Sequence, residues 1–423
     1  MGRQLFHTYP VFRQSILELD VCYKRRTGTS LIHDVGLFGD YTNDKLPAVW
    51  PISLILPTIT AVQLALFDLL VSFGLTPDIL IGHSAGETSL LYASGAGSKE
   101  MALEISIARG IAMTIVEEHS EGTMAAVACS ADDANRILQS VCSKRTDKTV
   151  EIACYNSPDA VALAGHTVLV DEAIALATKG GFMGRKIMTR VPVHCSLMEL
   201  CEAEFKELVG DVFARYPGEH RTKVKTYSTC TGDVLDAFTA EYFWQNSRNA
   251  VQFTKGMDNL LAAHSNPVVV EMSPHPVLAS YVTEIGIPSA SIVGPMRRSK
   301  VVTEHMEQTT LLTALGQLIV AGCNKVDFNL LNGRPKAAAA PRATLPAYPF
   351  AKKHVDYFPE LSRVMYRQMS AKNGPLNFPE LRINVATHPE LADHLINSEP
   401  IMPAAGFIEM VRASGAAIFA CSS

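Results

Sequence analysis

The chain has 423 residues, of which 48% are apolar and 19% charged, and a formal net charge of -5. This length allows two or three domains with a large core. The net charge speaks against the basic surface that nucleic acid requires, and the sequence has no Lys/Arg block of the kind that binds a membrane surface. Nucleic acid and membrane are therefore not expected as partners. The nine cysteines form no CxxC pair and no Cys/His cluster at zinc spacing, which indicates a reducing compartment and no metal site.

An apolar stretch at residues 48–67 is long enough to cross a bilayer. Prolines and several polar residues interrupt it, so we expect a helix that starts at Pro57 and runs to about Phe73 against a sheet. The first residues lead into polar and charged sequence without a signal peptide. A cytoplasmic protein is the prediction.

Residues 82–87 read Gly-His-Ser-Ala-Gly-Glu, after the apolar run 79–81 and before a helical pattern at 88–93. A strand, a tight turn and a helix are the context in which G-x-S-x-G marks a nucleophilic serine. The glycines permit the sharp turn. Ser84 then lies at a helix N-terminus, where free N–H groups favour an oxyanion. An ordinary glycine-rich turn is the alternative.

Helical and strand patterns alternate further along the chain. Helices are expected at 99–118, 131–141 and 168–179, and strands at 124–127, 152–155 and 161–164. The β-α-β-β-α order within 121–185 resembles a small ferredoxin-like insert. With strands resuming at 191–193 and 268–272, the fold class is α/β, a mostly parallel sheet with a small second subdomain.

A serine nucleophile needs a base, and His194 is the favoured candidate. It follows the apolar run 191–193, and catalytic groups collect where strands of open α/β sheets end. A structural histidine is the alternative. His83 adjoins Ser84, but successive side chains at an elbow point apart, so we expect it to pack beneath the turn.

Arg109 lies on the helix that follows the expected elbow helix, and its flanks are apolar. A guanidinium there is costly to bury unless an anion meets it. A substrate carboxylate held by two hydrogen bonds would fit, and a structural salt bridge is the alternative that spacing alone favours.

Several segments occur in the order of one protein family. They are GHSAGE (82–87), ARG (108–110), NSP (156–158), VPVHCSLM (191–198), YSTCTG (227–232), WQNSRNAVQF (244–253) and EMSPHPVL (271–278). Together they resemble malonyl-CoA:acyl-carrier-protein transacylases, and in particular the acyltransferase domain of fungal-type iterative reducing type I polyketide synthases. The resemblance covers residue 1 to about 298 and implies an α/β-hydrolase-like core.

The resemblance implies a role for each site residue. Ser84 would form a malonyl ester from malonyl-CoA, and His194 would take the serine proton and return it to the departing thiol. A backbone carbonyl within 249–253 would orient the histidine. The Ala85 N–H would serve the oxyanion hole, and Arg109 would grip the free malonyl carboxylate.

The resemblance also implies that Asn156 lines the acyl pocket or supports the dyad, and His83 is expected with it among the substrate-binding residues. The malonyl group would then pass to the phosphopantetheine thiol of an acyl carrier protein. The expected partners are therefore malonyl-CoA, an acyl carrier protein and other synthase domains. No bound cofactor is expected, since coenzyme A arrives as the substrate thioester and phosphopantetheine on the carrier.

The resemblance also divides the chain. Residues 1–298 form the acyltransferase, with a large subdomain (1–120 and 186–298) around the insert 121–185. Residues 299–360 match a post-acyltransferase linker with an alanine-rich run and an extended proline-containing strap. Residues 361–423 resemble the start of a dehydratase hot-dog domain, with His394 at the family's catalytic histidine.

Some features depart from the family. The first residues correspond to sequence just after the family's N-terminal G-x-G-x-Q segment, so we expect its core strand and one oxyanion N–H to be absent. Leu56 and Ser398 replace a usual glutamine and glycine. The dehydratase part stops before its catalytic aspartate, so His394 is expected to be idle. We therefore expect a piece of a larger synthase, with uncertain transferase activity because one oxyanion donor is worth about 10²–10³ in rate. The alternatives are an inactive scaffold fragment and a serine hydrolase or thioesterase, for which no acidic third member stands out.

Overall fold

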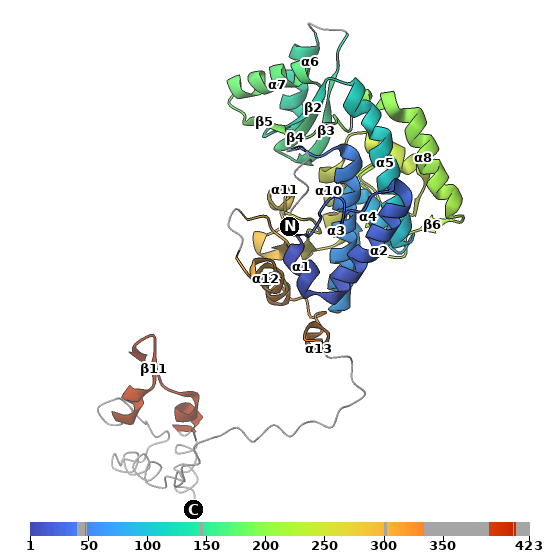
Figure 1. The fold of residues 1–423 in the computed structure, drawn as a ribbon. Helices are drawn as coiled ribbons and strands as arrows, with labels where there is room; N and C mark the ends of the chain where they lie inside the picture. Colours follow the sequence, from blue (N-terminus) through green and yellow to red (C-terminus); the bar gives the residue numbers. More distant parts are fainter. Residues whose placement is uncertain are drawn as a thin grey trace, which may run out of the picture. The chain divides into compact units, whose positions relative to one another are not determined.

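The computed structural model describes residues 1–39, 47, 49–143, 147–299, 303–333, 389–408 and 410–411. The chain divides into two compact units, Met1–Ala337 and Ala338–Ser423 (Figure 1). The alanine-rich run and the proline-containing strap of the expected linker fall outside the described residues.

Helices form the larger part of the first unit. In chain order they are α1 (Arg3–Thr8), α2 (Pro10–Thr27), α3 (Ile52–Ser72), α4 (Gly86–Ala93), α5 (Lys99–His119), α6 (Ala131–Cys142), α7 (Thr167–Lys179), α8 (Glu202–Arg215), α9 (Ala240–Arg248), α10 (Phe253–Ala263), α11 (Ala279–Glu284), α12 (Met306–Val320) and α13 (Phe328–Leu331). The short 3-10 helices η1 (Ser196–Cys201) and η2 (Ser289–Ser291) join them.

The strands of this unit are short outside the insert. They are β1 (Ile79–Ile81), β2 (Gly122–Val127), β3 (Val150–Ser157), β4 (Ala160–His166), β5 (Gly184–Ile187), β6 (His220–Arg221), β7 (Lys225–Tyr227), β8 (Ala237–Phe238), β9 (Val269–Val270) and β10 (Ile292–Val293). β1 pairs with β7 and β9 with β10, both in parallel, so the described parallel sheet consists of two strand pairs. The α/β class and its parallel pairing are confirmed.

One expected strand is wrong. Residues 191–193 form a loop, although β9 appears where a strand was expected near residue 268. Pro192 in this loop has no N–H to give to a ladder, and it instead lies where a Cβ on Gly122 would be only 2.3 Å from its Cγ. His194 therefore follows a loop and not a strand.

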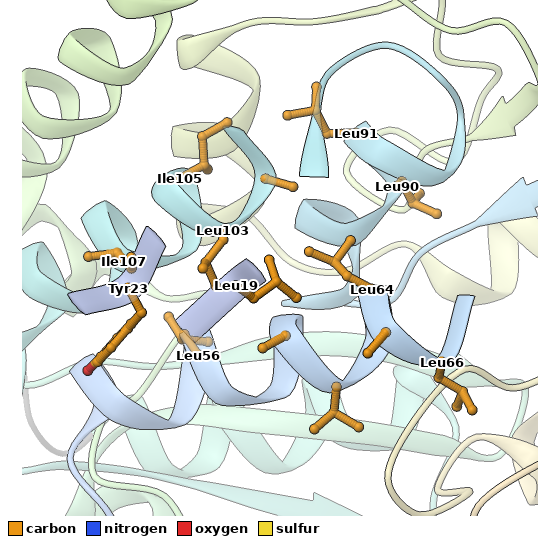
Figure 2. Close-up of a cluster of buried hydrophobic side chains, with 14 of the residues drawn as sticks. Leu19, Tyr23, Leu56, Leu64, Leu66, Leu90, Leu91, Leu103, Ile105 and Ile107 are labelled. Atoms are coloured by element: carbon orange, nitrogen blue, oxygen red, sulfur yellow. The ribbon is translucent and has the colours of Figure 1, made fainter. Parts of the chain in front are cut away.

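The core of the first unit lies where α2, α3, α4 and α5 meet. Figure 2 shows leucine and isoleucine side chains of α3, α4 and α5 gathered in one cluster with Leu19 and Tyr23 of α2. Leu56, which stands in place of the family's glutamine, is part of this cluster and 8% exposed. The helix bearing the serine motif is thus packed directly on the apolar core.

The apolar helix α3 starts five residues before the expected start at Pro57, because Ile52 is its first residue. Pro57 lies inside the helix, where it removes one backbone hydrogen bond. The flanking residues Leu54 and Leu56 are buried, and this packing holds the helix through the proline. By length and composition α3 could span a membrane, but 61% of its most apolar window is buried inside the protein, as in a core helix.

Close contact between α3 and α5 depends on Gly110. A Cβ atom at this position would lie 2.9 Å from Ser53 Cα and 3.2 Å from the Ile52 carbonyl oxygen. Both are backbone atoms, which cannot rotate away as a side chain can. We expect Gly110→Ala to lower the free energy of unfolding by about 1–3 kcal/mol through overpacking, although alanine is the better helix former.

Urea or thermal unfolding of the purified chain measures this effect. Gly210→Ala is the matched control, since Gly210 is inside α8 and a Cβ there would meet nothing within 4 Å. That control should raise the free energy of unfolding by up to about 1 kcal/mol. Equal changes in the two variants would contradict the packing explanation.

The insert has the ferredoxin-like topology that the sequence predicts. Its strand order is β3-β4-β2-β5 with every neighbouring pair antiparallel, which is the order of a β-α-β-β-α-β unit. Helices α6 and α7 share one apolar core with the sheet, as the green region of Figure 1 shows. The last strand pairs Ile187 with Met124, so the insert continues past the expected boundary at residue 185.

Helix α12 belongs to the first unit because it caps α1. The Glu307 carboxylate of α12 accepts hydrogen bonds from the backbone N–H groups of Gly2 (2.6 Å), Gln4 (2.8 Å) and Leu5 (3.2 Å). A carboxylate at a helix N-terminus satisfies free donors and complements the helix dipole. Residues expected in the linker therefore start as part of the acyltransferase-like unit.

The described part of the second unit begins with a 3-10 helix, η3 (Pro389–Asp393), and a hairpin, and residues 404–408 and 410–411 are helical. Strands β11 (Leu395–Ile396) and β12 (Glu399–Pro400) pair antiparallel. The two residues between them, Asn397 and Ser398, have φ values of 52° and 68°. This left-handed turn explains why glycine would suit the position of Ser398.

Candidate active site

The serine motif forms a sharp turn between β1 and α4. Ser84 has a φ of 54°, an uncommon conformation for a residue other than glycine, and α4 begins two residues later. A Cβ atom on Gly82 would lie 2.8 Å from Glu87 Cδ, so only glycine leaves space for that carboxylate. Ser84 is thus presented at the N-terminus of α4 by a strained turn, as the strand-turn-helix pattern predicts.

Glu87 anchors this turn to the neighbouring residues Thr229 and Tyr242. Its buried carboxylate accepts hydrogen bonds from the backbone N–H and hydroxyl of Thr229 (both 2.7 Å) and from the Tyr242 hydroxyl (2.7 Å). Burial raises the pKa of Glu87, and these hydrogen bonds oppose that shift. The sequence places Glu87 in the motif but does not indicate this anchoring role.

The side chain of His194 reaches Ser84 across 110 residues of sequence. Its Nε2 lies 2.7 Å from Ser84 Oγ, and its Nδ1 lies 3.0 Å from the Asn249 carbonyl oxygen. A carbonyl only accepts, so Nδ1 carries the proton and Nε2 is free to accept from the serine hydroxyl. The arrangement can therefore deprotonate Ser84.

The histidine is held in a single orientation. Its backbone N–H donates to the Ser247 carbonyl at 3.0 Å, and its φ is 67°, so both Ser84 and His194 have left-handed backbones. Burial lowers the pKa of His194 to about 3, and His83 and Arg109 act in the same direction. The imidazole is consequently neutral at physiological pH, which is the form a general base needs.

His83 and Asn156 form a pair beside the dyad. His83 Nε2 lies 2.8 Å from Asn156 Oδ1, and the His83 ring meets the edge of Phe253 with centroids 5.3 Å apart. Burial lowers the pKa of His83. Because Asn156 lies on β3, the insert contributes a polar group to the same site.

Ala85 offers a free donor next to the serine. It is the residue before α4, and no hydrogen bond from its N–H occurs among the described residues. An N–H at a helix N-terminus beside a nucleophile can stabilise a developing oxyanion.

Arg109 is buried close to the dyad, only 2% exposed. Its Nη1 donates to Thr88 Oγ1 at 2.6 Å and its Nη2 to Asn246 Oδ1 at 2.9 Å, while the ring of Phe243 lies 5.8 Å from the guanidinium carbon. Arg109 forms no ion pair with any described residue, and its buried Nε has no hydrogen-bond partner. Burial lowers its pKa to about 10, and the charge of Glu87 opposes this shift, so the group stays cationic at neutral pH.

The salt bridge that spacing alone favours for Arg109 is therefore not found among the described residues. The guanidinium is bound to two neutral acceptors. A buried cation with an unused donor can bind an anionic group such as a carboxylate.

One group in the described part of the chain has the composition of a metal site. Ligand atoms of Cys22, Glu100 and Glu104 lie within 4.8 Å of one another. Glu104 already accepts from Arg26 Nε at 2.7 Å and from Arg215 Nη2 at 2.9 Å. Burial raises the pKa of the Cys22 thiol to about 11, so the group is an ion-pair cluster that ties α2, α5 and α8 together.

His394 lies in the second unit, in the hairpin region. It is exposed, and its Nδ1 lies 2.8 Å from the Ile401 carbonyl oxygen. The described residues of this unit add no further catalytic group to it.

Comparison with known families extends this description. A model of the acyl transferase domain matches residues 1–324, and a model of the polyketide synthase dehydratase domain matches residues 375–423. The first match covers Ser84, His83, His194 and Arg109.

Curated relatives are fungal synthases. The chain is 42% identical over 420 residues to the highly reducing polyketide synthase stpks1 of Strobilurus tenacellus and 30% identical over 445 residues to tazB of Aspergillus terreus. These alignments cover 98% and 97% of the chain but 15% and 16% of the relatives. The chain thus spans less than a fifth of their length.

Solved structures give the same result. The chain resembles the acyltransferase domain from the second module of the salinomycin polyketide synthase, with a TM-score of 0.68, 25% identity and coverage of 83% of this chain and 76% of that one. It also resembles the acyltransferase domain of PpsC of Mycobacterium tuberculosis, with a TM-score of 0.59, 26% identity and coverage of 70% and 86%. The chain belongs to the acyl transferase domain family, and it is a polyketide synthase acyltransferase domain joined to part of a dehydratase domain.

Proposed function

We propose that this acyltransferase moves a malonyl group from malonyl-CoA to the phosphopantetheine thiol of an acyl carrier protein through an ester on Ser84. The observation that carries the choice of malonyl is Arg109, a buried cation with an unused donor close to the Ser84–His194 pair. A malonyl thioester has a free carboxylate at the end opposite its thioester carbonyl. One site can therefore hold the carboxylate on Arg109 while the carbonyl meets Ser84.

The first half-reaction follows from the dyad. Ser84 Oγ attacks the thioester carbonyl carbon while its proton passes to His194 Nε2, 2.7 Å away. The carbonyl oxygen becomes an oxyanion, which the Ala85 N–H stabilises, and the Asn249 carbonyl supports the imidazolium through Nδ1. The C–S bond then breaks and His194 returns the proton to the leaving sulfur, which releases coenzyme A.

The second half-reaction uses the same groups in the reverse sense. The phosphopantetheine thiol gives its proton to His194 and attacks the Ser84 ester carbonyl. The C–O bond of the ester breaks, and the proton returns to Ser84 Oγ. The malonyl group leaves as a thioester on the carrier protein, and the enzyme is restored.

A serine hydrolase would use water as the acceptor in place of the thiol. Many such enzymes orient their histidine with a carboxylate, whereas His194 Nδ1 is held by the Asn249 carbonyl. This difference favours a transferase, in which the acyl-enzyme reacts with a thiol and not with water.

Intact-protein mass spectrometry after brief incubation with malonyl-CoA tests the proposal. We expect a single malonyl adduct that maps to the peptide containing Ser84 and that is discharged quickly by added pantetheine but slowly by water. No adduct on folded protein would contradict the proposed reaction. An adduct that water removes as fast as pantetheine does would support a hydrolase instead.

We also propose a cytoplasmic location. The proposed partners are malonyl-CoA, the carrier protein and other synthase domains, and neither nucleic acid nor membrane is among them. The described cysteines are all free, which fits a reducing compartment.

A further inference from the structure

The side chain of Asn246, on α9, is the second buried group beside Arg109 with an unused donor. It is 2% exposed, and its Oδ1 accepts from Arg109 Nη2 at 2.9 Å. Its Nδ2 has no hydrogen-bond partner, and neither does Arg109 Nε. Arg109 and Asn246, which are hydrogen-bonded to each other, thus each keep one buried N–H donor without a partner.

The orientation of the amide follows from the chemistry of its neighbour. A guanidinium only donates hydrogen bonds, so Asn246 must turn its oxygen toward Arg109. The NH₂ group on the same carbon is then left beside the guanidinium. Buried donors in native proteins are nearly always paired, so these two require an acceptor that the described residues do not supply.

The position of Asn246 in the chain also links Arg109 to His194. It is followed by Ser247, whose carbonyl accepts from the His194 N–H, and soon after by Asn249, whose carbonyl accepts from His194 Nδ1. One short segment at the end of α9 therefore holds both the histidine of the dyad and the guanidinium.

We propose that Asn246 determines acyl specificity by orienting Arg109 through Oδ1 and by giving its Nδ2–H, together with Arg109 Nε–H, to the free carboxylate of the substrate. This inference rests on the proposed malonyl transfer and adds a second donor to the carboxylate site. A carboxylate has enough acceptor positions for both side chains. An acetyl group has no atom to offer them, so the two unused donors disfavour acetyl relative to malonyl.

The variant Asn246→Asp tests the donor while keeping an acceptor for Arg109. Aspartate keeps an oxygen for Arg109 Nη2, but replaces the donating NH₂ by a second, negatively charged oxygen. We expect the ratio of malonyl to acetyl loading of Ser84, measured as kcat/KM from the two CoA thioesters, to fall by about 10²-fold or more. An unchanged ratio would overturn the inference.

Gln245→Glu is the matched control. It makes the same amide-to-acid change one residue away, at an exposed side chain on α9 whose Nε2 donates to Glu241. This variant should keep the wild-type ratio. Should Asn246→Asp fail to fold, Asn246→Ala gives the same readout, with an expected fall of about tenfold for a lost donor to a charged group and an unchanged ratio as the contrary result.

Malonyl loading of the wild-type chain distinguishes a wrong role for Asn246 from a wrong proposed function. If malonyl-CoA acylates wild-type Ser84 and Asn246→Asp keeps the malonyl preference, only the role of Asn246 is wrong. If malonyl-CoA does not acylate the wild-type chain at all, the proposed function and this inference are both wrong.

Discussion

Replacing His194 with alanine should slow acylation of Ser84 by malonyl-CoA by about 10³–10⁴-fold, near the upper end of what a general base contributes. The imidazole Nε2 lies 2.7 Å from Ser84 Oγ, and the structure holds the ring neutral and correctly oriented. Without it, the serine proton has no acceptor except water. Stopped-flow or quenched mass spectrometry of the acyl-enzyme measures the rate.

His83→Ala is the matched control, because His83 is a second, partly buried histidine next to the serine. Its Nε2 is bonded to Asn156 and not to Ser84, so its loss should slow acylation by about tenfold at most, through a lost hydrogen bond and altered packing. The reverse order of effects, with His83→Ala the slower variant, would show that His83 is the base. Circular dichroism of both variants separates a chemical effect from unfolding.

The sequence predicts Ser84 well because the elbow is local. A short apolar strand, two glycines and a helical pattern are adjacent in the chain, and they suffice to position the hydroxyl at the start of α4. The ferredoxin-like insert is predictable for a similar reason, since its strands and helices alternate within one continuous segment.

The structure confirms that His194 lies next to Ser84 but corrects the expected reason for its position. The expected strand before it is a loop containing Pro192, and a left-handed backbone with the carbonyl groups of Ser247 and Asn249 orients the ring. These contacts come from a segment more than fifty residues later. Periodicity describes neighbours along the chain, so it cannot report such contacts.

The environment of Arg109 also depends on contacts between distant segments, which sequence patterns do not report. Its flanking pattern allowed a salt bridge or a ligand, and only the folded chain distinguishes them. Thr88 and Asn246 approach it from α4 and α9, and the bond to Asn246 spans 137 positions. The buried polar residues of those helices are the signal that sequence reasoning could have used, since a polar side chain on a buried helix face requires a partner.

Arg109→Ala should lower kcat/KM for malonyl loading by about 10²–10³-fold, while acetyl loading from acetyl-CoA stays within about threefold of wild type. The variant removes the only cation among the described residues that touches Asn246 and lies near the dyad, so the malonyl carboxylate would enter a neutral pocket. Acetyl has no carboxylate and loses nothing. The preference for malonyl is measured by competition between the two thioesters for Ser84.

Arg26→Ala is the appropriate control for removing an arginine that contacts α5. Arg26 donates to Glu104 of that helix at 2.7 Å, away from the dyad, and Glu104 keeps its bond to Arg215 when Arg26 is lost. That variant should change stability more than substrate preference. Parallel losses of malonyl and acetyl loading in Arg109→Ala would mean that Arg109 supports the dyad instead of reading the carboxylate. A selective loss of malonyl loading would separate acyl selection by Arg109 from bond making at Ser84 and His194.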